Sequence, residues 1–305
     1  MTDLAAYNED TLEANLAPHA GQAAAAEGLI WSTGFEEGQF QFVVGGRELD
    51  TDGPLWAQGQ FQDDDAVAFV SEPVRSGNLA LKYLWCKDKL GEANLTKKSM
   101  THYGKAATNA DSDRWYGFSL YIPKGGFPDE KQNAVIFQLH ATPDRTLGEP
   151  YRQPVVAFNI RDGKLTTAPS YDLEKVSPKN VNIEKNRLPF ELASITDLEG
   201  KWTDFVVHAK MGLENDAVYQ VWVDGKLMVD IKDFNMGYND EVGPYPSWGV
   251  YSYNSVGDQR ILYIDEVRIG DANATYEAVA PGRSDHTQKP RIEQAAECSC
   301  PEKQS

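Results

Sequence analysis

The feature that most constrains this sequence is a series of short apolar segments separated by turn-forming residues, with little helical periodicity. Within the segments apolar and polar residues alternate, and pairs such as Asp162-Gly163 and Asp224-Gly225 separate neighbouring segments. Alternation with a period of two is typical of half-buried strands, and Asp-Gly between two such runs indicates a hairpin. The strand candidates are residues 79–86, 114–122, 134–140, 155–160, 202–210, 218–223, 227–231, 248–253 and 261–269.

So many strands with so few helices favour an all-β fold, a β-jelly roll in which two antiparallel sheets form a concanavalin-like sandwich. The long stretches between strands, at 87–112, 141–153, 168–200 and 233–247, are uncommon unless they have a binding role, so we expect them to form a groove. We place the jelly-roll domain at residues 29–280. It is preceded by an N-terminal arm at 1–28 and followed by a flexible C-terminal tail at 281–305.

Charge and hydropathy exclude two classes of partner. Lys and Arg total 29 against 46 Asp and Glu, which gives a formal net charge of −17. We expect no nucleic-acid binding, because that affinity depends on basic side chains, and no membrane span, because no run of about 18 apolar residues exists. The N-terminus lacks a signal-peptide pattern, so the protein is either cytoplasmic or exported with its signal removed. We expect the second, a monomer secreted or held in the periplasm.

The three cysteines do not form a disulfide framework on their spacing alone. Cys86 lies in an apolar run and is predicted to be a buried free thiol. Cys298 and Cys300 lie in a polar tail, where a disulfide, a weak metal site or no role at all stay open.

Residues 134–140 carry an amide and an imidazole on one strand. Alternation places Gln138 and His140 on the same face as Ile136 and directs residues 135, 137 and 139 into the core. The other face of a curved sheet can form a groove, although a lone histidine on a strand is more often structural than catalytic. The pattern alone therefore makes His140 a candidate and does not assign it a role.

The Gln138-Leu139-His140 segment resembles the corresponding segment of the heparin lyase I and glucuronan lyase group. Further similarities follow in the same order along the chain: Gln153-Pro154, Gly200-Lys201-Trp202, Val221-Trp222-Val223-Asp224-Gly225 and Trp248-Gly249-Val250-Tyr251. Together they cover about residues 114–270. The resemblance implies a jelly-roll polysaccharide lyase that cleaves a uronate polysaccharide by β-elimination and leaves unsaturated uronate ends.

The resemblance also implies roles for three residues. β-Elimination needs a base to remove the proton at carbon 5, an acid to protonate the leaving oxygen, and a group that neutralises the sugar carboxylate. By resemblance the base is His140 and the acid is Tyr251. Gln138 is then placed to hydrogen-bond the carboxylate and stabilise the enolate-like charge.

Two departures from the group's pattern bear on the substrate. Ser247 stands where the heparin lyase I branch has a lysine, and the arginine expected on an early strand is replaced by Lys97, Lys98 and His102. Heparin calls for a basic cleft, which a chain this acidic does not favour. We therefore expect glucuronan, ulvan or alginate as the substrate, in preference to heparin.

Further candidates are substrate contacts and a structural calcium ion. The substrate candidates are Lys98, His102, Arg145, Arg152, Asn159, His208 and Tyr253. For most of them a role in solvation or packing stays open, although guanidinium groups pair well with carboxylates. Glu36 and Asp265 occur in motifs that hold one calcium in many lectin-like sandwiches, and the alternative is that both are merely solvated.

Two rival functions remain at this point. A non-catalytic carbohydrate-binding module would use aromatic platforms and would need neither a base nor an acid. A glycoside hydrolase would need two carboxylates about 5–10 Å apart, and no strand with that pattern is present. We therefore predict a lyase, with the binding module as the alternative.

Overall fold

The computed structural model describes residues 27–36, 38, 56–103, 112–128, 133–178 and 188–282. Most of the predicted arm and tail, together with Cys298 and Cys300, lies outside these residues. The described part is almost entirely β-structure, with two short α-helices, α1 (Ile195–Leu198) and α2 (Tyr276–Val279). No helix among the described residues is long and apolar enough to cross a membrane.

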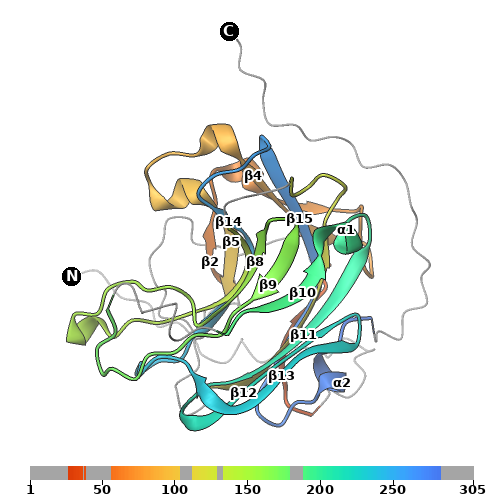
Figure 1. The fold of residues 1–305 in the computed structure, drawn as a ribbon. Helices are drawn as coiled ribbons and strands as arrows, with labels where there is room; N and C mark the ends of the chain where they lie inside the picture. The colour runs from red at the N-terminus through yellow and green to blue at the C-terminus, as the bar shows by residue number, and fades with distance from the viewer. Residues whose placement is uncertain are drawn as a thin grey trace, which may run out of the picture.

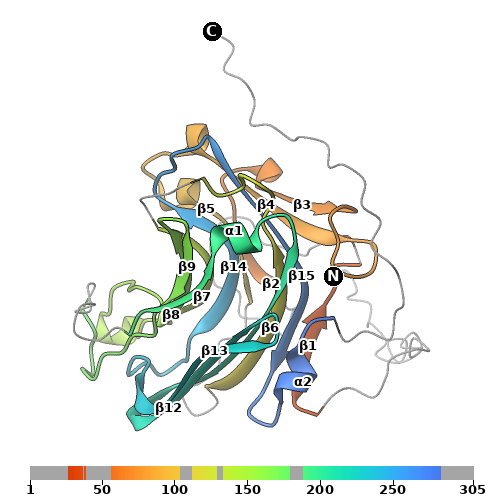
Figure 2. The same cartoon turned by 45° about the vertical axis from the view of Figure 1, so that its right-hand side comes forward.

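Within the described residues, fifteen strands form two antiparallel sheets that lie as two layers (Figures 1 and 2). The eight-stranded sheet has the order β13-β12-β11-β6-β15-β4-β3, and β1 also pairs with β15. The seven-stranded sheet has the order β10-β9-β8-β7-β14-β5-β2. Their bounds are β1 (Leu29–Thr33), β2 (Trp56–Gln60), β3 (Val67–Val70), β4 (Ala80–Cys86), β5 (Lys98–Tyr103), β6 (Asp113–Tyr121), β7 (Ala134–His140), β8 (Val156–Arg161), β9 (Lys164–Thr167), β10 (Phe190–Ser194), β11 (Trp202–Lys210), β12 (Gly212–Val223), β13 (Lys226–Met236), β14 (Tyr245–Ser252) and β15 (Gln259–Gly270).

Aromatic side chains from both sheets meet between the layers. The Phe118 ring of the larger sheet lies 4.9 Å from Phe137 and 6.0 Å from Trp248 of the smaller sheet, measured between centroids. Phe158 and Phe205 join the same cluster, and all five are fully buried. Rings of this size bury much apolar area and contribute most of the hydrophobic stabilisation of such a core. The predicted all-β sandwich is therefore confirmed.

The sequence pattern missed several strands, of which β5 matters most because it was expected to be part of a long loop. Ser99 and Thr101 occupy its core-facing positions, where apolar residues are expected. They are accommodated by hydrogen bonds: the Ser99 hydroxyl donates to the Leu84 carbonyl at 2.7 Å, and Thr101 pairs with the Tyr83 hydroxyl at 2.5 Å. A strand with polar residues on its buried face lacks the alternation of apolar and polar residues by which strands are predicted.

Irregular pairing on β7 corrects the predicted face of Ile136. The register against β8 shifts between Val135 and Phe137, so Ile136 and Phe137 both enter the core and Val135 turns out of it. Such a bulge reverses the alternation on one side of it. Gln138 and His140 keep the predicted face, away from the core.

Cys86 corrects another prediction, because it is disulfide-bonded and is not a free thiol. Its side chain is buried at the end of β4. The two other cysteines of the chain, Cys298 and Cys300, lie outside the described residues. An apolar neighbourhood predicts burial of a cysteine but says nothing of its pairing.

Candidate active site on the seven-stranded sheet

Three adjacent strands, β7, β14 and β5, bring polar side chains together on the face of the seven-stranded sheet that is turned away from the core. We call this the site face. Gln138 of β7 lies opposite Ser247 of β14, and Ser247 lies opposite His102 of β5. His140 lies opposite Tyr245, the first residue of β14. Residues directly opposite in adjacent strands point to the same face, so these five side chains form one site.

Tyr245 stands between the two histidines of this site. Its ring centroid lies 5.3 Å from that of His140 and 5.7 Å from that of His102, and the latter pair meets edge to face. Tyr245 and His140 are both half-buried, and His102 is buried. Sequence reasoning missed Tyr245, because only the register of β14 against β7 and β5 places it here.

His140 has the geometry that a general base requires. Its Nδ1 lies 2.8 Å from the carbonyl oxygen of Ala141, so Nδ1 carries the proton and Nε2 keeps its lone pair. Burial lowers the pKa of His140 to about 4, and the positive charges of Lys98 and Arg152 act in the same direction. The imidazole is therefore neutral near pH 7.

His102 is held more tightly than His140. Its Nδ1 lies 2.6 Å from the Ser247 hydroxyl, while its buried Nε2 has no hydrogen-bond partner. Burial lowers the pKa of His102 to about 3, with further lowering from Lys98 and His140. A buried nitrogen without a partner is costly unless a ligand completes it, so His102 fits a role in substrate contact.

The predicted acid, Tyr251, lies farther along β14. It is opposite Val135, three residues along β7 from Gln138. Its hydroxyl donates to Tyr253, and burial together with this contact raises the pKa of Tyr251 above its ordinary value. Lys98, opposite Tyr251 on β5, and Asn159, opposite Val135 on β8, belong to the same row. Lys98 links this row to the histidines, because its ammonium lies 5.1 Å from the centre of the Tyr251 ring and its charge also lowers the pKa of His140.

Arg152 requires a correction, because it is a buried structural residue. Its guanidinium is fully buried and is paired with Glu149 at 3.0 Å and with Asp240. It therefore links the loop after β7 to the loop before β14 and presents no free donor pair to a substrate. Burial raises the pKa of Asp240 to about 6, although Arg152 opposes this shift. Arg145 in the same loop is exposed and lies over the Tyr151 ring at 3.9 Å.

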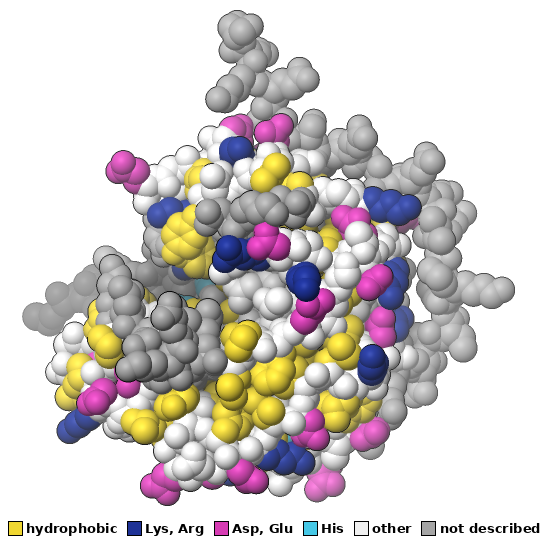
Figure 3. All heavy atoms as spheres, in the orientation of Figure 1, with side chains coloured by type: hydrophobic (Ala, Val, Ile, Leu, Met, Phe, Trp, Pro, Cys, Tyr) yellow, Lys and Arg dark blue, Asp and Glu magenta, His cyan; other side chains and the backbone are white. Residues whose placement is uncertain are grey.

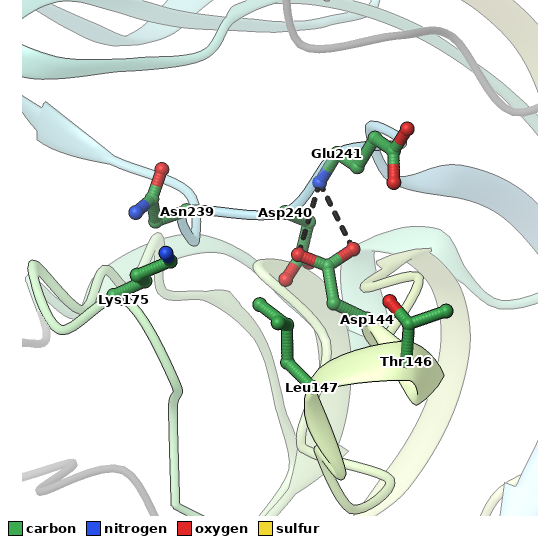
Figure 4. A pocket seen from close by; sticks show the side chains of 7 residues that line it. All are labelled: Asp144, Thr146, Leu147, Lys175, Asn239, Asp240 and Glu241. Carbon is green, nitrogen blue, oxygen red and sulfur yellow. Dashed lines mark hydrogen bonds between the residues drawn. The ribbon is translucent and has the colours of Figure 1, made fainter.

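Together with Lys175, these two loops also line an open cavity of about 320 Å³ (Figure 4). The Asp144 carboxylate accepts the backbone N–H of Glu241 at 3.0 Å, and the Thr142 hydroxyl donates to the Gly243 carbonyl at 2.9 Å. These two hydrogen bonds join the loop that follows His140 to the loop that precedes Tyr245.

His208 also requires a correction, since it does not belong to this site. It lies on β11 of the other sheet, on the face away from the core. The imidazole stacks on Trp115 at 4.0 Å, and its two nitrogens contact Asp113 at 2.8 Å and Gln220 at 3.1 Å. These contacts give His208 a structural role.

Glu36 and Asp265 both hold the loop at residues 75–79. The Glu36 carboxylate accepts backbone N–H groups of Asn78 and Leu79, and Asp265 accepts those of Arg75 and Ser76. Among the described residues, the one group of three or more His, Cys, Asp or Glu side chains that brings one ligand atom from each within 4.8 Å of the others is Asp144, Glu149 and Asp240. The carboxylates of Glu36 and Asp265 thus both accept backbone N–H groups of one loop, and a calcium ion at this pair stays a prediction from the sequence motifs.

Charge on the surface is mixed. On the described part of the face shown in Figure 3, Lys and Arg lie singly among Asp and Glu, and no large basic patch is present.

A family model described as polysaccharide lyase matches residues 50–268, which is most of the chain and includes every residue of the site. The chain belongs to the polysaccharide lyase family. It is an enzyme of that class, and a non-catalytic binding module is not favoured.

Comparison with solved structures agrees with the fold. An endo-β-1,4-glucuronan lyase from the fungus Trichoderma reesei superposes with a TM-score of 0.61 at 18% identity, covering 75% of this lyase and 95% of that chain. The family 7 alginate lyase A1-II′ matches with a TM-score of 0.47 at 12% identity, covering 66% and 82%. A search of curated protein sequences finds no match. The predicted jelly-roll lyase fold is thus confirmed.

Proposed function

We propose that this lyase cleaves a uronate polysaccharide without dense sulfation, with a glucuronan-type polymer as the first candidate. The mixed surface charge and the absence of a lysine at Ser247 support a substrate without dense sulfation. The structural match to a glucuronan lyase supports the same substrate class. Ulvan and alginate are the next candidates.

The proposal is carried by one observation, the contact of the Tyr245 ring with both His140 and His102. In the proposed reaction, Nε2 of His140 removes the proton from carbon 5 of the uronate. The electron pair forms the double bond between carbons 4 and 5, and the bond from carbon 4 to the glycosidic oxygen breaks. Tyr245 donates its phenolic proton to that departing oxygen.

Neutral donors would hold the carboxylate of the same sugar. Gln138 and His102 lie in one row across the strands, and the unpartnered Nε2 of His102 donates in the tautomer whose Nδ1 accepts from Ser247. Hydrogen bonds to the carboxylate stabilise the enolate-like charge that develops as the proton leaves. Tyr251 stays the acid predicted from resemblance, and Tyr245 is proposed as a second candidate because its ring lies beside His140 and His102.

We also propose that the protein is exported and works as a monomer. The disulfide at Cys86 supports an oxidising compartment, because disulfides are rare in the cytosol.

The test is a screen of glucuronan, ulvan, alginate and heparin for unsaturated uronate products. We expect cleavage of glucuronan and no cleavage of heparin. Heparin as the preferred substrate would overturn the substrate proposal, and activity retained in His140→Ala would overturn the assignment of the base.

A further inference from the structure

Cys86, the last residue of β4, forms a disulfide bond that the proposed reaction does not use. The chain contains three cysteines, so Cys298 and Cys300 are the two residues that can supply the partner sulfur within one molecule. Both lie outside the described residues. Whether either can reach Cys86 depends on the face that Cys86 occupies and on where the described chain ends.

Cys86 points away from the core of the sandwich. Tyr83 and Trp85 of the same strand are fully buried, and the Tyr83 hydroxyl contacts Thr101 of the other sheet. Successive residues of a strand point to opposite faces, so Cys86 lies on the outer face of the eight-stranded sheet. The segment that carries its partner therefore has to lie over that outer face.

The described chain ends on the same outer face. Val279 of α2 packs there against Val206 of β11, and a side chain at Gly282 would lie 2.5 Å from the Arg75 guanidinium. The backbone N–H of Arg75 donates to the Asp265 carboxylate of β15 at 2.8 Å. The last described residues thus lie beside Asp265, on the sheet that contains Cys86.

The remaining chain is long enough to reach Cys86 from this point. Cys86 lies opposite Gln259, and Gln259 is six residues from Asp265 on β15, which corresponds to roughly 20 Å at about 3.3 Å per residue. Sixteen residues separate Gly282 from Cys298, and an extended chain of that length spans roughly 53 Å at about 3.3 Å per residue. Both tail cysteines are therefore within reach without any change in the sandwich.

A disulfide between the Cys86 residues of two copies does not fit this position. Cys86 is only 1% exposed, and its backbone is held on both sides by the Gln62 side chain, at 2.7 Å from the N–H and 2.9 Å from the carbonyl. A disulfide needs Cβ atoms about 3.5–4.5 Å apart. Two folded sandwiches cannot bring two such buried side chains that close.

We propose that Cys86 is cross-linked to Cys298 or Cys300, so that the segment after Gly282 forms a covalent strap over the outer face of the eight-stranded sheet. The bond closes a loop of more than 200 residues, and a disulfide stabilises a fold more when the loop that it closes is longer. The other tail cysteine stays a thiol. Because His140 and Tyr245 lie on the other sheet, the strap acts on stability and not on proton transfer.

Peptide mapping without reduction tests the pairing directly. Trypsin cleaves after Lys and Arg, so Cys86 falls in residues 83–87 and both tail cysteines fall in residues 292–303. For protein exported into an oxidising medium, we expect mass spectrometry to find these two peptides joined, with one further thiol on the tail peptide open to alkylation. An alkylated Cys86 peptide, two Cys86 peptides joined to each other, or a disulfide between Cys298 and Cys300 would each overturn the proposal.

Replacing both tail cysteines measures what the strap contributes. We expect the Tm of the double variant Cys298→Ser and Cys300→Ser to fall by about 5–10 °C, the effect of one disulfide in a domain of this size. The wild type in dithiothreitol should reach the same lowered Tm. Ser299→Ala leaves both cysteines in place and should keep the wild-type Tm. An unchanged Tm in the double variant would show that the tail does not strap the fold.

These two experiments need no substrate, so their outcome is independent of the proposed function. On glucuronan, at a temperature well below the Tm, we expect kcat/KM of the double variant to stay within about twofold of the wild type, since the strap is on the other sheet from the site. A folded double variant that loses most of its activity would overturn the assignment of the strap to stability alone.

Discussion

At the scale of single residues, the site is defined by histidines that burial keeps neutral. A general base must be unprotonated, and the hydrogen bond from Nδ1 of His140 to Ala141 leaves Nε2 as the accepting nitrogen. An imidazole in water would be partly protonated near pH 6.5. Because burial lowers the pKa of His140 to about 4, the imidazole stays unprotonated at pH 6.5 and can act as a base over a wider pH range.

Replacing Tyr245 with Phe tests the proposed acid, because only the hydroxyl is lost and the ring contacts with His140 and His102 remain. We expect kcat to fall about 100-fold or more while KM stays within about threefold, since the proton is transferred only in the transition state. Tyr121→Phe, on β6 of the other sheet, is the control and should leave both parameters unchanged. Retained activity in Tyr245→Phe would return the role to Tyr251.

The pH dependence tests the electrostatic environment of His140. The folded pKa is about 4, so we expect kcat to stay level down to about pH 5 and to fall below it, as the base becomes protonated. Lys98 and Arg152 both lower this pKa, and the neighbouring His102 is neutral in the same range. In Lys98→Met the pKa of His140 therefore rises, and the acidic limb of the kcat profile moves to higher pH. If the acidic limb of the kcat profile stayed at the same pH, the charge of Lys98 would not affect the pKa of His140.

At the scale of elements, the position of His140 relative to Tyr245 depends on two loops. His140 ends β7 and Tyr245 begins β14, so each lies next to a loop of the cavity in Figure 4. Arg152 joins these loops through its ion pairs with Glu149 and Asp240. A buried ion pair of this kind adds little net stability but fixes geometry, and removing one partner leaves the other charge buried.

Arg152→Met should therefore destabilise the protein by about 3–5 kcal/mol, because Glu149 and Asp240 lose their counter-charge. Arg161→Met is the matched control, since its pair with Asp162 is exposed and is worth about 1 kcal/mol or less. Urea denaturation of both variants measures the difference. If the two variants lose equal stability, the buried network does not hold the loops.

Chelation tests the role of Glu36 and Asp265 as anchors of the loop at 75–79. Their oxygens already accept backbone N–H groups, so we expect the Tm to be the same with and without EDTA. A ligand bound only to the folded state would raise the Tm in proportion to its occupancy. A lower Tm in EDTA, restored by added Ca²⁺, would support the calcium ion expected from the sequence motifs.

The sequence predicts which face a side chain takes where apolar and polar residues alternate. It does not predict which residues of neighbouring strands lie opposite each other. Gln138 and His140 could be placed on one face because β7 is regular beyond its bulge. Tyr245 could not be found in this way, since its position depends on the register of β14 against two strands. Alternation also does not explain Gly249, where a side chain would meet the Ser99 carbonyl at 2.2 Å and the φ of +131° favours glycine.

At the scale of the whole molecule, the net charge of −17 opposes the approach of an acidic polymer. Attraction is confined to a few groups such as Lys97 and Lys98 on the site face. Long-range repulsion between exposed charges is screened over about 10 Å at 0.1 M salt, whereas a contact inside the site is screened much less. Binding therefore depends on a balance between weak global repulsion and short-range pairing.

This balance predicts an unusual salt dependence for a lyase acting on a polyanion. Raising NaCl from about 0.01 M to 0.15 M reduces the Debye length from about 30 Å to about 8 Å. We therefore expect kcat/KM on glucuronan to rise over this range, because repulsion from the acidic surface weakens before the contacts of the site do. An enzyme with a basic cleft would lose activity instead, since its attraction is screened. A steady fall in kcat/KM from the lowest salt would show that local positive charge, and not the net charge, governs the encounter with substrate.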